Sequence, residues 1–534
     1  MINEILNNLV NEADSKIKSY SNSKKNPGRK KNSGSKLDVA KVEAGVGKQD
    51  KNNYGIVYTP FFLTEKIISL IPQHYFQNPE LRWLDVGAGN GVFSIIIYKR
   101  LFDGLKTVIP DTLERHSHII EKMLYLVELY PPHIERLREI FGESANIIDR
   151  CFLSLHPGDG GILGGTQGFD FIVGNPPYNT NGAIKTPTNH NIKKTDDGRA
   201  IYVDFVFKSL ELLHVGGFLS FIIPNIWLKP DRAGLYNRLT GLKIHNLCCL
   251  STDETIRSFN YQAQTPTCYF LIENTSAMDG VENEDKNNTR IPIWDNLYEK
   301  FVPYRLLPDF PIPCHGVSII NRLMPFIEKY GFLSVLKTNC PSKTVSVREN
   351  RDDIYKYPNI RTCVLGKAVS KAEAKAEKTS IKIRDTDYVL SIDYSDKPCV
   401  YSGCRKIVLA HKMYGIPFFD REGKYGISAR DNYVVLGSND VNANANADAD
   451  NMLEEIYALL TTRFAQFIFS VCNYRMRYLE RYAFQFIPDI THIEKFPSLR
   501  ASQNANNGDK DKLIARFFGF TQEESKYIDD FCRI

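Results

Sequence analysis

A glycine-rich turn between a strand and a helix constrains the fold of this chain more than any other segment. A largely apolar run ends at Val86, glycine then recurs at Gly87, Gly89 and Gly91, and the apolar, helix-like stretch Val92–Tyr98 follows. Glycine lets the backbone turn tightly and approach a ligand closely. This order predicts the first βα unit of a Rossmann-like α/β domain, which binds its ligand at the carboxyl ends of parallel strands.

The spacing of these glycines restricts the ligand. Val92 stands where the third glycine of a pyrophosphate-binding GxGxxG loop would be, which disfavours a dinucleotide. S-adenosylmethionine has no phosphate and carries an ammonium group. Asp85, at the end of the strand, is placed to accept a hydrogen bond from such a cation. S-adenosylmethionine is therefore the expected cofactor.

A second short apolar run, Tyr125–Leu129, contains an acid near its end. Glu128 lies where an α/β sheet can offer a carboxylate to two ribose hydroxyls. The interval from Asp85 to Glu128 is longer than is usual for such an acid. A salt bridge, or a cap for a helix starting near Pro131, is the alternative role for Glu128.

The motif Asn175-Pro176-Pro177-Tyr178 closes the buried strand predicted at Phe169–Gly174. Two prolines fix φ and remove two backbone donors, so the Asn side-chain oxygen and the neighbouring carbonyls are held as acceptors. The tyrosine adds a flat aromatic surface. Such a loop is suited to hold a planar –NH2 group, and a plain strand-ending turn is the alternative interpretation.

These motifs resemble, in their order, those of the S-adenosylmethionine-dependent DNA adenine-N6 methyltransferases of the restriction-modification type, over residues 54–274. With the composition, the resemblance implies a basic tail at 1–52, a methyltransferase domain at 53–273, a linker at 274–289 and an α+β target-recognition domain at 290–534. It implies direct methyl transfer to N6 of a flipped-out adenine in duplex DNA, with the Asn-Pro-Pro-Tyr motif as the catalytic loop.

Further cofactor contacts follow from the resemblance. Thr59 lies in a Thr-Pro segment that implies a contact with the methionine part of the cofactor, and Glu128 is carried over as the ribose ligand. Phe152 is expected to stack on the cofactor's adenine. The acid that usually precedes this Phe is replaced by Cys151, so Asp149 is expected to take over its hydrogen bond, with a slipped register as the alternative.

Aromatic and basic residues are the expected contacts to the substrate. Phe259 resembles the position whose ring faces the flipped base, and Tyr261 is an equal candidate. In the C-terminal half, Arg475, Arg477 and Arg481 alternate with tyrosines at helical spacing. We expect the arginines to contact phosphates and the tyrosines to lie in the core.

Three other functions stay open. An RNA adenine-N6 methyltransferase would use the same chemistry, and a protein glutamine N5-methyltransferase also holds a planar amide in such a loop. The large C-terminal half disfavours the glutamine enzyme. A DNA-binding homologue without catalysis is consistent with the altered Cys151 position.

Composition predicts an intracellular, cytoplasmic protein, or a nuclear one if the host has a nucleus. The longest apolar stretch, Phe218–Leu228, is too short to span a bilayer, and no signal-peptide core begins the chain. The 11 cysteines show no CxxC spacing, which argues against zinc and disulfide frameworks. We expect a monomer with duplex DNA as its partner, and leave open whether a cognate restriction endonuclease exists.

The charge of the chain is unevenly distributed. The segment Lys16–Lys36 holds eight basic and no acidic residues, and removing these eight charges from the net +5 leaves −3 for the remainder. A disordered tail with non-specific attraction to phosphate is expected there, with a functionally neutral extension as the alternative. Any nucleic-acid surface on the folded part must come from local clustering of charge.

Overall fold

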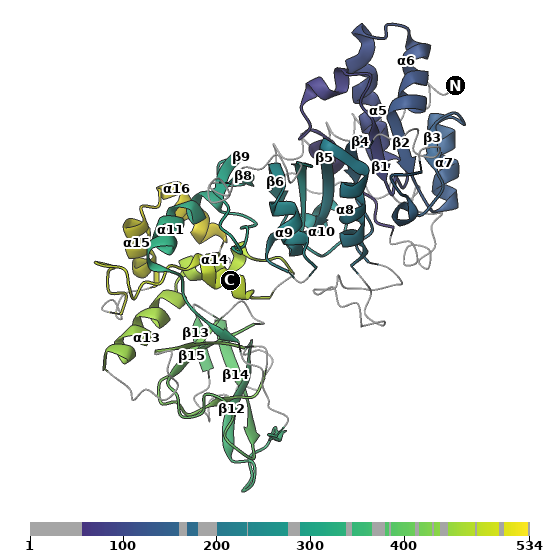
Figure 1. The fold of residues 1–534 in the computed structure, drawn as a ribbon. Coiled ribbons are helices and arrows are strands. Elements are labelled where there is room, and N and C mark those ends of the chain that lie inside the picture. Colours follow the sequence, from purple (N-terminus) through teal and green to yellow (C-terminus); the bar gives the residue numbers. More distant parts are fainter. Residues whose placement is uncertain are drawn as a thin grey trace, which may run out of the picture. The chain divides into compact units, whose positions relative to one another are not determined.

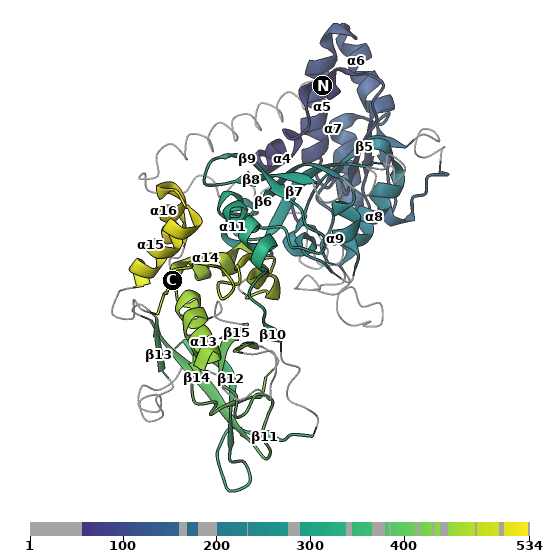
Figure 2. The same ribbon diagram turned by 60° about the vertical axis from the view of Figure 1, so that its left-hand side comes forward.

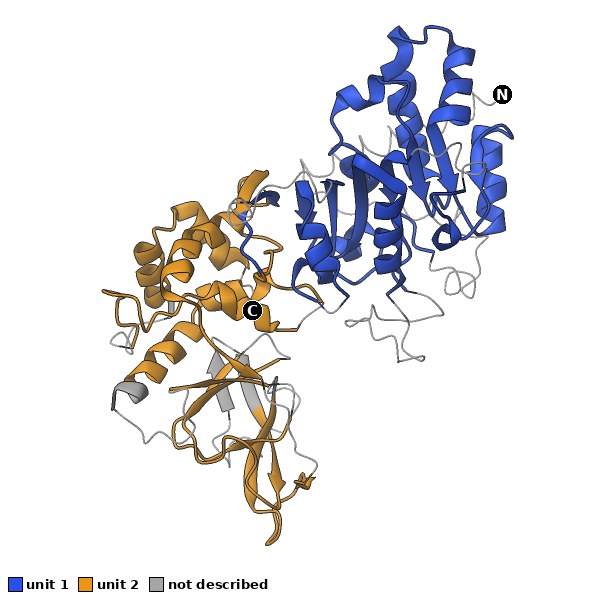
Figure 3. Cartoon of the chain, viewed as in Figure 1, with its two compact units in different colours: residues 1–294, 305–308 blue, residues 295–304, 309–534 orange. Residues whose placement is uncertain are grey.

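The computed structural model describes residues 56–159, 168–179, 200–231, 233–275, 289–337, 344–365, 380–383, 386–411, 416–429, 432–437, 447–475, 478–500 and 507–531. The predicted basic tail, most of the predicted linker and Arg477 lie outside these residues. The chain divides into two compact units, coloured separately in Figure 3. Unit 1 comprises residues 1–294 and 305–308, and unit 2 comprises residues 295–304 and 309–534.

Unit 1 is built on a mostly parallel sheet, which confirms the predicted Rossmann-like α/β fold. Its strands lie in the order β3-β2-β1-β4-β5-β7-β6, followed by β8 (Figure 1). The pairs from β3 to β5 are parallel, whereas β7 runs antiparallel to both of its neighbours, and Figure 2 shows β6 and β7 side by side. The strands are β1 (Trp83–Val86), β2 (Leu124–Val127), β3 (Asn146–Ile148), β4 (Phe169–Gly174), β5 (Leu213–Pro224), β6 (Lys243–Cys249), β7 (Thr267–Glu273) and β8 (Arg290–Asp295).

Helices and short turns connect these strands. Pro131 and Pro132 open α7, where a fixed φ suits the first turn, and a capping box between Ser251 and Glu254 starts α10. The helices are α4 (Phe61–Ile68), α5 (Val92–Gly104), α6 (Thr112–His118), α7 (Pro131–Phe141), α8 (Ile201–Leu212), α9 (Leu235–Thr240) and α10 (Thr252–Ser258). The short 3-10 turns are η2 (Gln73–Gln77), η3 (Leu105–Thr107), η5 (Phe152–Ser154) and η6 (Asn225–Leu228), and η4 (Ile119–Met123) is a short π-helix.

The central strand β1 marks the topological switch point of the sheet. Asp85 lies beside Leu126 of β2 on one side and beside Val173 of β4 on the other, and both pairings are parallel. The connection after β1 leads to β2 on one side, whereas the connection after β4 leads to β5 on the other, and this divergence opens a crevice at the carboxyl ends of the strands. The glycine loop and the Asn-Pro-Pro-Tyr motif follow β1 and β4, so both lie at this crevice.

A buried aromatic stack supports the crevice from within the sheet. Trp83 in β1 stacks on Phe171 in β4 with ring centroids 4.0 Å apart, and Phe76 stacks on the other side of Trp83 at 4.9 Å. All three rings are at most 1% exposed. This packing fixes the relative positions of the two strands that carry the motifs.

The spacing of apolar residues predicts a helix over residues 202–213 that is ended by Gly216-Gly217 and followed by a strand at Phe218–Ile223, and the structure differs at the double glycine. The helix α8 ends at Leu212, and β5 begins directly at Leu213, so Gly216 and Gly217 lie inside the strand and do not end the helix. A Cβ on Gly217 would approach the carbonyl oxygen of Phe169 to 2.8 Å. The glycine is needed because β5 passes close to the start of β4.

Unit 2 contains two small sheets that share one apolar core, in the orders β10-β18-β15-β16 and β11-β14-β12-β17, with β13 beside β14. Ile360 and Leu390 from one sheet pack with Val408 and Val434 from the other. The strands are β10 (Leu336–Lys337), β11 (Val347–Arg348), β12 (Tyr357–Leu365), β13 (Ser380–Ile383), β14 (Thr386–Ser395), β15 (Lys406–Ala410), β16 (Pro417–Asp420), β17 (Gly426–Ile427) and β18 (Asn432–Leu436), and β9 spans Lys300–Arg305.

Helices form the rest of unit 2. The sequence of residues 452–471 is helix-like throughout, but the structure divides it into two helices, since Thr462 caps the second one by accepting from the Ala465 N–H. The helices are α11 (Val317–Tyr330), α13 (Ala447–Leu460), α14 (Arg463–Val471), α15 (Asn507–Phe518) and α16 (Gln522–Phe531), with the turn η10 (Arg481–Phe486). The structure therefore gives unit 2 the mixed α and β content expected for it.

The helical spacing predicted for the Arg/Tyr segment at 473–482 is wrong over its described residues. Helix α14 ends at Val471, and the next turn begins only at Arg481. Tyr474 is fully buried, as expected of the tyrosines, and its hydroxyl donates to the Ile312 carbonyl at 2.8 Å. This tertiary bond holds the chain in an irregular path where local spacing alone favoured a helix.

Within the described ranges, no helix combines the length and the apolar character needed to cross a bilayer.

Candidate active site

A cavity of about 240 Å³ in unit 1 opens where β1, β2 and β4 end. Three of the predicted motifs reach it from separate strands. Its walls include Gly87, Gly89, Val127, Glu128, Leu129, Asn175 and Pro177 from these strand ends, and Ile56, Val57, Tyr58, His133, Arg150, Cys151, Phe152, Ile201 and Phe205 from the surrounding segments.

The glycine loop adopts a backbone that other residues rarely tolerate. Gly87, Gly89 and Gly91 have φ of 66°, 58° and 85°. A Cβ on Gly91 would also lie 3.0 Å from the Leu137 side chain. The loop therefore turns tightly into α5, and its backbone stays next to the cavity without side chains that would fill it.

Glu128 connects the glycine loop to the end of β2. Its Oε2 accepts from the Gly89 N–H at 2.6 Å, and its Oε1 accepts from the backbone N–H groups of Leu129 and Tyr130 at 3.0 and 2.9 Å. Burial alone would raise the pKa of this carboxyl, but the nearby His133 imidazole and hydrogen bonds from backbone N–H groups outweigh it and lower the pKa. Glu128 is thus an ionised, oriented acceptor at the cavity wall.

Asp85 is fully buried behind the glycine loop and is not among the residues that line the cavity. Its Oδ2 accepts from the Ser94 hydroxyl at 2.5 Å, whereas Oδ1 is a buried acceptor without a hydrogen-bond partner among the described residues. Burial raises the pKa of Asp85 to about 7, and the Ser94 hydroxyl only partly opposes this rise.

Asn175 is held by its amide nitrogen, which donates to Thr59 Oγ1 at 2.9 Å and to the Val57 carbonyl at 3.4 Å. A carbonyl can only accept, so these contacts fix which end of the amide is nitrogen. The oxygen Oδ1 is buried and has no hydrogen-bond partner among the described residues. Thr59, at 7% exposure, therefore lies against the Asn175 amide.

The rest of the Asn-Pro-Pro-Tyr motif is firmly placed. Pro176 is buried, and Pro177 lines the cavity. Tyr178 is half-buried, its hydroxyl donates to the Ile222 carbonyl of β5 at 3.3 Å, and its ring meets Tyr202 edge-on at 6.2 Å. Burial raises the pKa of the Tyr178 hydroxyl far above its ordinary value. The ring is thus fixed beside the cavity and is not part of its described wall.

The two candidates for the adenine contact lie in different environments. Cys151 lines the cavity, whereas Asp149 is exposed and is not among its lining residues. Phe152 also lines the cavity and is 3% exposed, with its ring 5.0 Å from Phe205. Cys151 and Phe152 thus both line the cavity, whereas Asp149 does not.

The two candidates for the flipped base also differ. Phe259 is 1% exposed, whereas Tyr261 is 75% exposed. Asn260 and Tyr261 both have positive φ, 48° and 67°, a backbone that is strained for residues other than glycine. The loop precedes Thr267, which pairs with Pro224 at the end of β5, so it lies at the same edge of the sheet as the Asn-Pro-Pro-Tyr motif.

The predicted phosphate contacts belong to unit 2 and are described by themselves. Arg475 is partly buried and lies 3.5 Å from Glu480 Oε1. Arg481 is exposed at the start of η10, and Arg477 lies outside the described residues. The described part of this segment therefore presents one exposed and one ion-paired arginine.

Sequence reasoning did not single out His133 and Tyr58 as functional residues. Both line the cavity, and the Tyr58 hydroxyl lies 3.0 Å from His133 Nε2. Tyr58 is next to the quoted Thr-Pro segment, and His133 follows Pro131-Pro132, but nothing in their spacing indicates that they meet. Only the fold brings them together.

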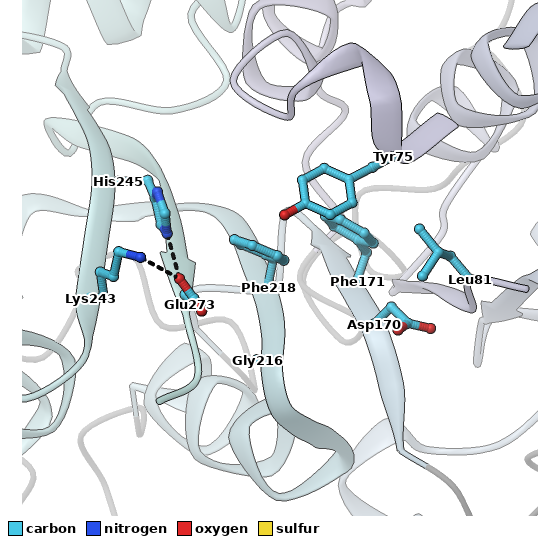
Figure 4. Close-up of a pocket in the computed structure, with 9 residues that line it drawn as sticks. All are labelled: Tyr75, Leu81, Asp170, Phe171, Gly216, Phe218, Lys243, His245 and Glu273. Atoms are coloured by element: carbon cyan, nitrogen blue, oxygen red, sulfur yellow. Dashed lines mark hydrogen bonds and ion pairs between the residues drawn. The ribbon is translucent and has the colours of Figure 1, made fainter. Parts of the chain in front are cut away.

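A second cavity in unit 1, of about 280 Å³, lies at the opposite, amino-terminal edge of the sheet (Figure 4). Figure 4 shows Lys243 and His245 pointing toward Glu273, whose Oε2 lies 3.0 Å from Lys243 Nζ and 2.8 Å from His245 Nε2. The ring of Tyr75 covers Phe171 at a centroid distance of 5.1 Å. Because these charged groups pair with one another and none is a predicted site residue, this cavity is separate from the candidate active site.

Comparison with known proteins gives a family match over part of unit 1. Residues 85–250 match the family described as Eco57I restriction-modification methylase. This range contains the glycine loop, Glu128 and the Asn-Pro-Pro-Tyr motif.

The chain matches individual relatives over limited lengths. The chain is 29% identical over 182 residues to the type II methyltransferase M.PaeR7I of Pseudomonas aeruginosa, covering 31% of each protein. It is 27% identical over 299 residues to the modification methylase CviBIII of Paramecium bursaria Chlorella virus NC1A, covering 55% of this chain and 64% of that protein. The chain thus matches less than two thirds of the length of these curated relatives.

Among solved structures, the ATP-dependent Type ISP restriction-modification enzyme LlaBIII bound to DNA is similar with a TM-score of 0.46 and 12% identity, over 83% of this chain and 40% of that one. The sequence matches, together with the fold of unit 1, confirm the resemblance to restriction-modification adenine methyltransferases, and residues 85–250 are the part of the chain that is similar to the Eco57I restriction-modification methylase family.

Proposed function

We propose that this protein transfers a methyl group from S-adenosylmethionine to N6 of adenine at specific sites in duplex DNA. One observation supports this function above all others. The Asn175 Oδ1 acceptor is buried, has no hydrogen-bond partner among the described residues and has its orientation fixed by Thr59 and Val57. An unsatisfied buried acceptor costs free energy, so its retention indicates a donor that arrives with the substrate.

The residues of the cavity fit S-adenosylmethionine by their chemistry. Gly87 and Gly89 leave room for close approach of the backbone, and Glu128 is an ionised acceptor suited to ribose hydroxyls. Phe152 offers an aromatic ring to an adenine, with Cys151 beside it and Asp149 as the more exposed alternative. When bound, the cofactor supplies an electrophilic methyl group on a sulfonium.

Two buried oxygens extend this fit toward the methionine part. Asp85 Oδ1 belongs to the strand end that leads into the glycine loop, and Thr59 Oγ1 contacts the amide of Asn175. Asp85 is suited to an ammonium group through its unsatisfied oxygen. Thr59 is proposed to contact the methionine part while it also orients the Asn175 amide.

The catalytic loop acts on the amino group of adenine. The N6 lone pair is delocalised into the ring, so the nitrogen is a weak nucleophile until its geometry changes. The Asn175 Oδ1 and the Pro176 carbonyl each accept one N6 hydrogen, which draws the nitrogen toward tetrahedral geometry and localises its lone pair. A C–N bond then forms as the methyl–sulfur bond breaks, and N6 afterwards loses one proton to solvent.

A base in a duplex must leave the stack to reach this loop. Tyr178 is proposed to contribute the aromatic surface of the motif, held by its hydrogen bond to Ile222. Tyr261, which is exposed on a strained loop at the same edge of the sheet, is better placed than the buried Phe259 to meet the flipped base. Phe259 then supports that loop from the core.

Unit 2 is proposed as the DNA target-recognition part. Its exposed Arg481 is suited to a phosphate, and Arg477 is proposed for the same role. Arg475, which pairs with Glu480, is proposed to contact phosphate only if that pair opens.

Parallel assays with isotopically labelled cofactor test the function. The full chain is incubated with duplex DNA, RNA and protein, and the labelled product is digested and analysed for N6-methyladenine. We expect label in DNA as N6-methyladenine, with far less in a parallel reaction of Asn175→Ala. Label in RNA or in glutamine side chains alone would overturn the choice of substrate, and cofactor binding without any transfer would indicate an inactive DNA-binding homologue.

A further inference from the structure

The segment before α4 is tied to the cofactor cavity by one side-chain pair. The Tyr58 hydroxyl lies 3.0 Å from His133 Nε2, and the two rings meet edge-on with centroids 5.8 Å apart. Tyr58 belongs to the segment 56–58, every residue of which lines the cavity, and His133 lies in the first turn of α7. The pair therefore joins two walls that are 75 residues apart in the sequence.

His133 extends this pair to the ribose-binding candidate. Its Nδ1 lies 3.7 Å from Glu128 Oε1, an electrostatic contact that is longer than a hydrogen bond, and Glu128 Oε2 in turn accepts from the Gly89 N–H at 2.6 Å. If Nε2 accepts the tyrosine proton, Nδ1 carries the imidazole proton and directs it toward the carboxylate. His133 and Glu128 are 6% and 8% exposed, so water competes little for these contacts.

This arrangement differs from ordinary core packing in its location. A histidine that only filled the core would not need to face both the carboxylate of Glu128 and the segment 56–58 across the cavity. The Tyr130 ring meets His133 edge-on at 5.0 Å and fixes the plane of the imidazole. The imidazole is thus oriented by three neighbours, two of which line the cavity.

We propose that His133 is a positioning residue for cofactor binding: through Tyr58 it holds the segment 56–58 over the cavity, and through Glu128 it orients the carboxylate that receives the ribose. The chain Tyr58–His133–Glu128–Gly89 then couples closure of the cavity to recognition of a nucleoside that bears two free ribose hydroxyls. The inference rests on the proposed function, since it assigns the cavity to S-adenosylmethionine.

Direct cofactor binding to the full chain, without DNA, tests this role. Dissociation constants and dissociation rates for S-adenosylmethionine are measured for the wild type, Tyr58→Phe, His133→Ala and the double variant. One lost hydrogen bond of about 1 kcal/mol corresponds to about fivefold weaker binding, which we expect mainly as faster dissociation. The double variant is expected to bind no more weakly than His133→Ala, because both changes break the same chain.

Two further variants separate positioning from general loss of structure. His133→Gln retains a side-chain acceptor for Tyr58 and is expected to recover part of the affinity lost in His133→Ala. Tyr75→Phe is the matched control, because Tyr75 belongs to the second cavity, and it is expected to bind like the wild type. Hydrogen exchange at residues 56–58 in the ligand-free protein is expected to rise in Tyr58→Phe and not in Tyr75→Phe.

The outcomes distinguish this inference from the proposed function. A wild-type protein that fails to bind S-adenosylmethionine would overturn the proposed function itself. The positioning role alone would be overturned if the wild type binds S-adenosylmethionine and both Tyr58→Phe and His133→Ala bind it with wild-type affinity. Hydrogen exchange at residues 56–58 would then also be unchanged. Strictly additive losses in the double variant would show that Tyr58 and His133 act independently, which also contradicts it.

Discussion

Asn175 and Thr59 are joined by a hydrogen bond of 2.9 Å between the amide nitrogen and the threonine hydroxyl oxygen. The bond connects the end of β4 to a segment 116 residues earlier in the chain. It engages the donor end of the amide and leaves the oxygen end as the buried acceptor. The catalytic loop and the Thr-Pro segment therefore act as one unit in the proposed chemistry.

Replacing Asn175 by Ala is expected to reduce methyl transfer to DNA by about 10² to 10³, the range for removal of one polarising group from a catalytic site. Binding of S-adenosylmethionine should change little, because the glycine loop and Glu128 stay in place. Single-turnover transfer and calorimetric cofactor binding measure the two quantities. A variant with near wild-type transfer would contradict the acceptor role of Asn175.

Replacing Thr59 by Val removes the group that orients the Asn175 amide while it keeps the shape of the side chain. We expect kcat to fall by about fivefold, which corresponds to about 1 kcal/mol for the lost hydrogen bond. Thr59→Ser keeps the hydroxyl and should restore most of the rate. Equal rates for the Val and Ser variants would show that the hydroxyl does not orient the amide.

Much of unit 1 could be predicted because its signals are local. The strand at Phe169–Gly174 and the turn at Gly87 are specified by apolar runs and by glycine itself, and the structure places both at the bounds expected. The prediction that Gly216-Gly217 ends a helix was wrong, because Gly217 is required by its contact with β4, a strand distant in sequence. A local pattern cannot report that contact.

The motifs of the candidate site could be predicted from the sequence, but the contacts between them could not. Asn175 and Glu128 were found from strand ends, whereas the bond to Thr59 and the chain through His133 depend on tertiary placement. The helix predicted for the Arg/Tyr segment is absent from its described residues, because the buried Tyr474 hydroxyl donates a hydrogen bond to the Ile312 carbonyl, 162 residues earlier. Spacing favours a helix only where no such long-range contact competes with it.

Cofactor affinity is expected to depend on pH through Asp85, whose pKa burial raises to about 7. Below that pH the carboxyl is protonated in the folded protein, and an ammonium group gains no partner. Apparent affinity for S-adenosylmethionine should therefore fall by roughly 15-fold between pH 7 and pH 5.5. Titration calorimetry over this range measures it, and Asp85→Asn should show weak binding with little pH dependence. A flat wild-type profile would argue against a direct role of the Asp85 charge.

Acid is expected to destabilise unit 2 through His315. The ring is buried against Phe531 at 4.3 Å, Nε2 meets the Ser470 hydroxyl at 3.0 Å, and burial lowers its pKa to about 3. The unfolded chain binds a proton near pH 6.5 and the folded chain does not, so stability is lost as pH falls below 6.5. At pH 5 the loss is about 2 kcal/mol.

Urea unfolding of the full chain at pH 7 and pH 5 measures this loss. His315→Gln should reduce the difference between the two pH values, whereas His492→Gln, at a side chain that is 70% exposed, should leave it unchanged. If both variants kept the full wild-type pH dependence, acid sensitivity would have to arise from other groups.

Replacing Gly174 by Ala tests the junction between β4 and β1, on which the whole site depends. A Cβ at this position would lie 2.7 Å from the Val86 carbonyl oxygen, and φ is 148°, so both space and backbone oppose a side chain. Gly234 is the matched control, because its φ of 76° imposes a backbone cost but nothing lies within 4 Å of its Cβ. We expect Gly234→Ala to cost about 1 to 2 kcal/mol in the free energy of unfolding and Gly174→Ala clearly more, since the two central strands must separate. Equal costs would mean that the contact between Gly174 and Val86 relaxes easily and that β4 is not locked against the glycine loop.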